Sequence, residues 1–173
     1  MRSTALWLKA LIVPILLLAS SSQSAERARS ADDSYLDALV GHWDMRGTLG
    51  GKAVRYHAQA ARLLQGGWVR LHMIDAATPP QYEASLYLGY DAKAGDFVGH
   101  WLDRFGAAGA RVVATGHRDD ERLVLLFPYA DGAFRDTFTR QPGAGAWTLL
   151  IESQNADASW ATFATYELKR VTN

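Results

Sequence analysis

Ten short runs with strand-like alternation follow one another along most of the chain, each bounded by a turn signal. Paired glycines such as Gly50-Gly51 and Gly66-Gly67 suit tight hairpins, because glycine adopts positive φ without strain. No break holds a long crossover, so successive runs are expected to pair as antiparallel hairpins. The predicted strands cover 42–49, 53–64, 68–75, 83–90, 96–103, 110–117, 121–127, 133–140, 146–153 and 160–171. The pattern predicts an all-β, about ten-stranded up-and-down meander, and closing it into a barrel removes the exposed sheet edges.

A short helix signal precedes the first strand. Asp33 or Ser34 can cap it, and Leu36, Leu39 and Val40 then recur at helical spacing. Gly41 follows directly, where a helix C-terminal glycine belongs. With no internal repeat or linker beyond this point, residues 34–173 are predicted to form one domain.

The N-terminus has the pattern of a targeting signal. Arg2 and Lys9 flank the start of an apolar stretch from Leu11 to Ala19, and small residues follow up to Ala25. That stretch is shorter than the ~20 residues that a membrane span needs. Residues 1–25 are therefore predicted to be a signal peptide cleaved near Ser24 or Ala25, with 26–33 as a flexible leader. The mature protein would be periplasmic or secreted, with no stable membrane anchor after cleavage.

Composition excludes several functional classes. The chain has no cysteine, which excludes disulfides, thiol chemistry and a lipid-modified cysteine. Lys and Arg number 18, as do Asp and Glu, and neither sign forms a block. Nucleic acid and anionic membrane surfaces are therefore not expected as partners.

The Gly41-His42-Trp43 step after a short helix resembles the opening of the calycins, the superfamily of lipocalins and fatty-acid-binding proteins. The resemblance implies a helix that plugs one end of a barrel and a tryptophan that packs beneath it. It also implies a basic side chain from the last strand against that tryptophan. Lys169 or Arg170 could supply this cation–π contact, which gives Gly41, Trp43 and Arg170 a structural role.

The wider pattern resembles the bacterial family called domain of unknown function 1579. Four segments carry the resemblance: Leu36 to Trp43, the Gln65-Gly66-Gly67-Trp68 hairpin, Gly89-Tyr90-Asp91 with Trp101-Leu102-Asp103, and the closing Tyr166 to Arg170. The resemblance spans nearly the whole mature chain and implies a lipocalin-like barrel. It implies no chemistry, since a fold does not carry a function by itself.

No catalytic motif is present, and the candidate metal ligands are scattered. The five histidines fall on five different predicted strands, without the spacing of a metal site: His42, His57, His72, His100 and His117. We therefore expect neither a metal nor a cofactor. Asp103 shares strand parity with Trp101, and beside that ring its carboxyl could act as an acid or base. The alternative is that Asp103 caps the turn at Phe105-Gly106 or pairs with Arg104.

Arg135 and Asp136 lie mid-strand and must point to opposite faces. Arg135 is the first candidate for a ligand contact, because a lumen arginine can hold a carboxylate by a fork of hydrogen bonds. The alternative is an outward arginine beside acids of the neighbouring strand. Trp101, Asp103, Tyr87 and His72 complete the candidate ligand contacts. The sequence does not decide which face of each strand points inward, since both are partly apolar.

Three functions are compatible with these observations. The first is an exported barrel that binds a small apolar or amphipathic molecule in its lumen. The second is a packed-core structural or interaction domain of the cell envelope. The third is an enzyme that uses Asp103 or a histidine as acid or base on a lumen-bound substrate.

Overall fold

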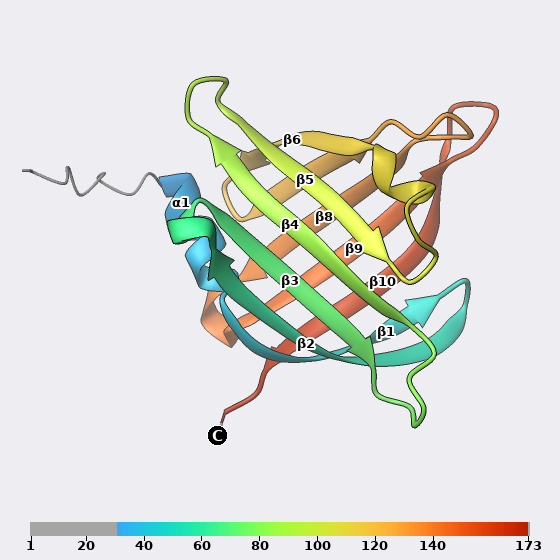
Figure 1. The fold of residues 1–173 in the computed structure, drawn as a ribbon, viewed down its shortest axis with the longest axis horizontal. Coiled ribbons are helices and arrows are strands. Elements are labelled where there is room, and N and C mark those ends of the chain that lie inside the picture. Colours follow the sequence, from blue (N-terminus) through green and yellow to red (C-terminus); the bar gives the residue numbers. More distant parts are fainter. Residues whose placement is uncertain (1–30, 173) are drawn as a thin grey trace, which may run out of the picture.

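The computed structural model describes residues 31–172, apart from the side chains of Ala31 and Asp33, and shows one closed antiparallel barrel (Figure 1). The predicted signal segment lies outside the described residues. Helix α1 covers Ala31–Leu39. The strands are β1 (Gly41–Leu49), β2 (Lys52–Leu63), β3 (Trp68–Asp75), β4 (Glu83–Asp91), β5 (Asp96–Asp103), β6 (Val113–Asp119), β7 (Arg122–Phe127), β8 (Phe134–Gln141), β9 (Ala146–Gln154) and β10 (Trp160–Arg170). The predicted fold class is confirmed.

Each strand pairs with its neighbour in sequence, and β1 pairs with β10 to close the barrel. Two details differ from the expectation. The helix begins at Ala31, so residues 31–33 of the expected leader are helical and neither Asp33 nor Ser34 precedes the helix. Strand β6 begins at Val113, because a 3-10 turn occupies Gly109–Arg111. No helix among the described residues is long and apolar enough to cross a membrane.

Gly41, two residues before Trp43, makes room for a contact between the C-terminus of α1 and the last strand. The Arg170 guanidinium lies 4.3 Å from the centroid of the Trp43 ring and donates hydrogen bonds to the carbonyls of Ala38 and Val40, at 2.9 Å each. It thereby satisfies carbonyls left free at the C-terminus of α1. Gly41 has φ +146°, and a Cβ there would collide with Nη1 of Arg170. This is the geometry that the calycin resemblance implies for Gly41, Trp43 and Arg170.

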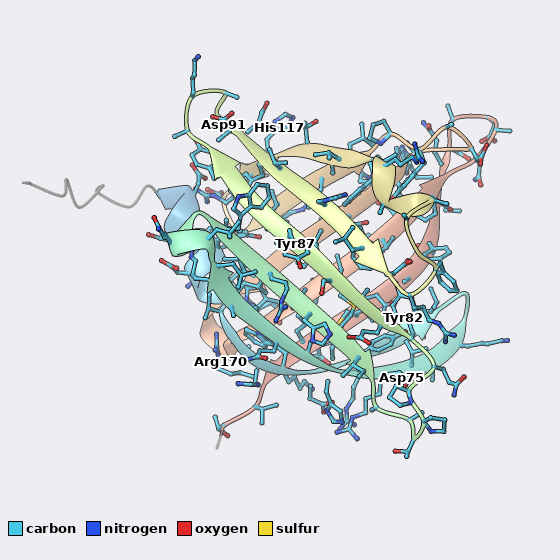
Figure 2. The ribbon with its side chains drawn as sticks, viewed as in Figure 1. Asp75, Tyr82, Tyr87, Asp91, His117 and Arg170 are labelled. Atoms are coloured by element: carbon cyan, nitrogen blue, oxygen red, sulfur yellow. The ribbon has the colours of Figure 1, made fainter. Side chains whose placement is uncertain are left out.

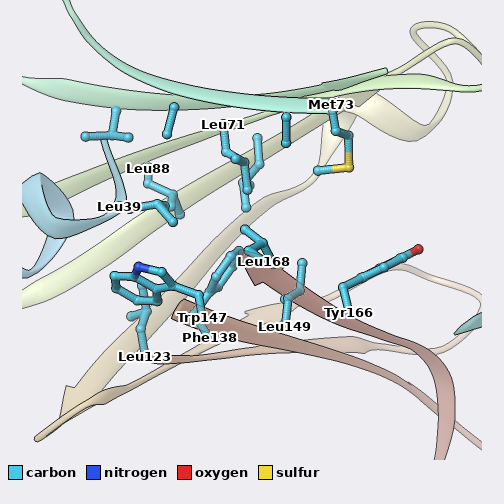
Figure 3. Packing of buried hydrophobic residues seen from close by; sticks show 14 of the residues in the cluster. Leu39, Leu71, Met73, Leu88, Leu123, Phe138, Trp147, Leu149, Tyr166 and Leu168 are labelled. Carbon is cyan, nitrogen blue, oxygen red and sulfur yellow. The ribbon is translucent and has the colours of Figure 1, made fainter. Parts of the chain in front are cut away.

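The end of the barrel beside α1, the helix end, is filled by side chains. The Trp43 indole donates to the Leu39 carbonyl at 2.8 Å, and the Tyr35 hydroxyl lies 3.2 Å from the carbonyl of Phe138. Figure 3 shows the buried side chains extending from Leu39 and Trp147 near the helix to Met73 and Tyr166 farther away. The core is therefore packed at one end of the barrel.

Candidate functional site

A cavity of about 590 Å³ occupies the other end of the barrel, which we call the open end. Nearly all the strand residues that line it lie in the part of their strand farther from α1, and Tyr166 lies near the middle of β10. The loops 76–82, 104–112 and 128–133 surround it. In Figure 2, Tyr82 marks this end, opposite α1. The connections at the helix end are short, such as 92–95 and 120–121. One end of the barrel is thus closed by a helix, and the other leads into a hollow.

The cavity walls are mostly apolar. Its large apolar lining residues include Met73, Trp101, Phe127, Phe134 and Ile151, while its polar groups are Gln81, Tyr82, Asp103, Tyr129, Asp136 and Tyr166. No lysine, arginine or histidine lines it among the residues that the structure describes. A volume of this size lies within the range of about 300–1,000 Å³ that small-molecule sites occupy.

Asp136 is the buried carboxylate of this cavity. Its side chain points inward with Phe134 and Phe138, and the residues beside it on the neighbouring strands are Leu125 and Ile151. Only 3% of Asp136 is exposed, and its carboxyl forms no hydrogen bond or ion pair with the side chain or backbone of any other residue that the structure describes. Burial therefore raises the pKa of Asp136 to about 8, because leaving water disfavours the ionised form.

Tyrosine rings surround the mouth of the cavity. Tyr56 lies 5.8 Å from Tyr166 and 5.9 Å from Tyr82, measured between ring centroids, with edge-to-face geometry. Tyr129 stacks on Phe127 at 6.0 Å and meets Phe134 edge-on at 5.8 Å. Burial raises the pKa of Tyr82, Tyr129 and Tyr166, so their hydroxyls keep their protons and can donate hydrogen bonds.

Trp101 and Asp103 line the cavity together, but the Asp103 carboxyl already has partners. One of its oxygens accepts a hydrogen bond from the Phe105 amide at 2.9 Å, and the other lies 3.4 Å from the Tyr82 hydroxyl. The Gly106 amide donates to the Asp103 carbonyl at 3.1 Å. Asp103 thus caps the turn after β5, which was the alternative expected for it.

Arg135 does not face the cavity, contrary to its selection as the first ligand contact. It points to the outer surface, where it pairs with Glu152 of β9 at 2.7 Å and its guanidinium lies 4.4 Å from the Trp160 ring centroid. The alternating pleat directs Arg135 and Asp136 to opposite faces, and the aromatic neighbours of Asp136 set which face is inside.

Tyr87 and His72 are also outside, so neither is a lumen contact. On β4, the buried neighbours Leu86 and Leu88 point inward, and Tyr87 lies beside Arg70 of β3 on the outer face. His72 pairs with Glu83 at 2.8 Å. The remaining histidines stay on separate strands, and no group of metal-ligating side chains forms in the part of the chain that the structure describes.

Sequence reasoning missed several cavity residues. Asp136 had a signal, since it alternates with two phenylalanines on one face of β8. Phe163 had none, because a register shift between Thr162 and Ala164 interrupts the alternation of β10 and lets Phe163 reach the mouth. Tyr82, Phe105 and Tyr129 lie on loops, where strand parity gives no direction.

Comparison of the chain with models of known protein families and with curated proteins finds no match. The functional argument therefore rests on the geometry of the cavity.

Proposed function

We propose that this chain is an exported barrel that binds a small apolar or amphipathic molecule in its lumen. The observation that carries the proposal is the hollow open end. The helix end is filled with side chains, as a structural domain would require, but about 590 Å³ beside it is not. Proteins pack their interiors closely, so an apolar hollow of this size is typical of a binding site.

Burial of apolar surface would supply the affinity, at about 0.8 kcal/mol for each methylene group removed from water. The polar groups of the cavity would then set the orientation of the ligand. Export rests on the predicted signal peptide, and membership in the family of domain of unknown function 1579 stays a prediction.

The test is titration with N-phenylnaphthylamine, an uncharged apolar dye whose fluorescence rises in apolar surroundings. We expect a saturable increase with the wild-type protein. Ile151→Trp, which places a larger side chain in the cavity, should weaken dye binding by about tenfold or more if the dye loses contacts worth roughly 1.4 kcal/mol.

Leu126→Trp is the matched control, because Leu126 is 43% exposed on the outer face of β7. It should leave dye binding unchanged. A wild-type protein that gives no fluorescence increase, or an equal response from both variants, would contradict the proposal.

One observation favours a second function, acid or base catalysis in the lumen. A buried carboxyl with a pKa raised to about 8 can exchange a proton near neutral pH, and Asp136, rather than the Asp103 expected from the sequence, provides it. Any molecule extracted from the protein could be incubated with the wild type and with Asp136→Asn. Chemical conversion by the wild type alone would establish an enzyme, whereas recovery of the molecule unchanged from both would favour a carrier.

A further inference from the structure

We propose that the molecule bound in the cavity carries a basic nitrogen, and that its cationic group pairs with the Asp136 carboxylate while its apolar part fills the aromatic walls. This inference rests on the proposed binding function and specifies the class of ligand. It reverses the expectation of an anionic, fatty-acid-like ligand held by Arg135.

The first argument is charge. The two ionisable acids that line the cavity are Asp103 and Asp136, and no basic side chain accompanies them among the described lining residues. Once Asp136 is ionised, a ligand carboxylate would meet a like charge there, with no basic side chain in the described lining to pair with it. A protonated amine would find the opposite charge in surroundings of low dielectric constant, where attraction is strongest.

The second argument is the unmatched state of Asp136. A buried polar group normally has a hydrogen-bond partner, because leaving one unpaired is costly. Asp136 has none among the described residues, although it is 97% buried and its pocket is open toward the mouth. A ligand donor is therefore the partner that this side chain lacks, and an ammonium group supplies up to three N–H donors.

The third argument is the aromatic wall around the carboxyl. Tyr129 and Phe134 meet edge to face at 5.8 Å, and the Tyr166 ring lies on the same cavity. Ring faces attract cations, and the attraction is stronger when water is excluded. A cationic group near Asp136 would therefore also be within reach of aromatic side chains that can stabilise it.

The experiment compares three probes of the same shape: phenylbutylamine, phenylbutanol and phenylbutanoate. Their affinities are measured by isothermal titration calorimetry at pH 8, where the amine is still protonated because alkylamines titrate near pH ~10. We expect the amine to bind about tenfold or more tightly than the alcohol, since hydrogen bonds between charged groups are about twice as strong as neutral ones. The carboxylate should be the weakest.

A pH series adds a readout that apolar contacts alone would not move. The titratable groups that face the site are Asp136 on β8, Asp103 on β5, Tyr166 on β10, and Tyr82 and Tyr129 on the loops, with Tyr56 of β2 packed behind Tyr166. Amine binding requires Asp136 to lose its proton, so the affinity for the amine should rise by about tenfold from pH 6 to pH 7, by less from pH 7 to pH 8, and level off above that. Binding of the alcohol should not rise.

Asp136→Asn should abolish both the preference for the amine and its pH dependence while leaving alcohol binding in place. Asp131→Asn, the same change on an exposed loop residue outside the cavity lining, should retain both. The comparison of the three probes on the wild-type protein tests the proposal even if neither variant folds.

The outcomes separate the two proposals. If N-phenylnaphthylamine binds but the alcohol or the carboxylate equals the amine, or none of the three binds, the ligand class is wrong and the binding function stands. If neither the dye nor any probe binds, both proposals fail.

Discussion

The replacement Asp136→Asn tests whether the buried carboxyl costs the fold stability. In the folded protein the pKa of Asp136 is raised from 3.8 to about 8 by burial, so the folded state holds its proton while the unfolded chain has released it. Between these two values the folded state binds one more proton than the unfolded state does. The wild type should therefore lose about 1.4 kcal/mol of unfolding free energy for each unit that the pH rises.

The magnitude follows from the width of that window. From pH 5 to pH 7 the loss amounts to about 3 kcal/mol, and above pH 8 it levels off because both states are ionised. The asparagine variant has the same shape and no titrating proton at this site. Its unfolding free energy relative to the wild type should consequently increase by about 3 kcal/mol over the same interval.

Urea denaturation followed by tryptophan fluorescence measures this difference, since taking wild type against variant cancels the titration of all other groups. Asp131→Asn makes the same chemical change on an exposed side chain and serves as the control. If the difference in unfolding free energy between the wild type and Asp136→Asn stays constant from pH 5 to pH 7, the reasoning is refuted. The Asp136 carboxyl would then not have a pKa raised by burial.

Three further substitutions test the fold and the outer surface. Trp43→Ala should lower the unfolding free energy by about 3–5 kcal/mol, because it removes a side chain that is 1% exposed together with its hydrogen bond to the Leu39 carbonyl. A loss under about 1 kcal/mol in urea denaturation would contradict the packing of Trp43 beneath the helix. Gly47→Ala should destabilise by more than about 1 kcal/mol, since a Cβ would collide with the Thr165 carbonyl, and an unchanged thermal midpoint would contradict that contact. Arg135→Ala should leave the affinities for the dye and the amine within about twofold of the wild type, because its ion pair with Glu152 lies on the outer surface and solvated ion pairs contribute little to stability. A loss of binding in calorimetry would show that Arg135 contributes to the ligand site.

The order and bounds of the strands could be predicted because, in a meander, recognisable turn residues separate each strand from the next. Nine of the ten strands begin within one residue of the expected position. The exception is β6, which begins later because of the 3-10 turn at Gly109–Arg111, a local hydrogen-bonded turn that alternation does not reveal. Closure through β1 and β10 followed from the need to remove sheet edges, and the Gly41-Trp43 step marked where the helix meets the barrel.

The interior was harder to predict, because both faces of these strands carry aromatic and charged side chains. Whether Arg135 or Asp136 points inward depends on which face of β8 completes the apolar interior of the barrel. That interior is formed by all ten strands together. An arginine can be solvated and paired outside, as it is with Glu152. The Asp136 carboxyl is the group that remains inside. Burying an unpaired carboxyl costs stability, and such groups cluster at functional sites.

The most direct test of the account is native mass spectrometry of the protein purified from an exported fraction, followed by organic extraction. We expect a discrete small mass bound to the wild type and absent from Ile151→Trp. A wild-type protein with a clean apo mass and no fluorescence increase with N-phenylnaphthylamine would contradict the claim that the open end of this barrel is a ligand site.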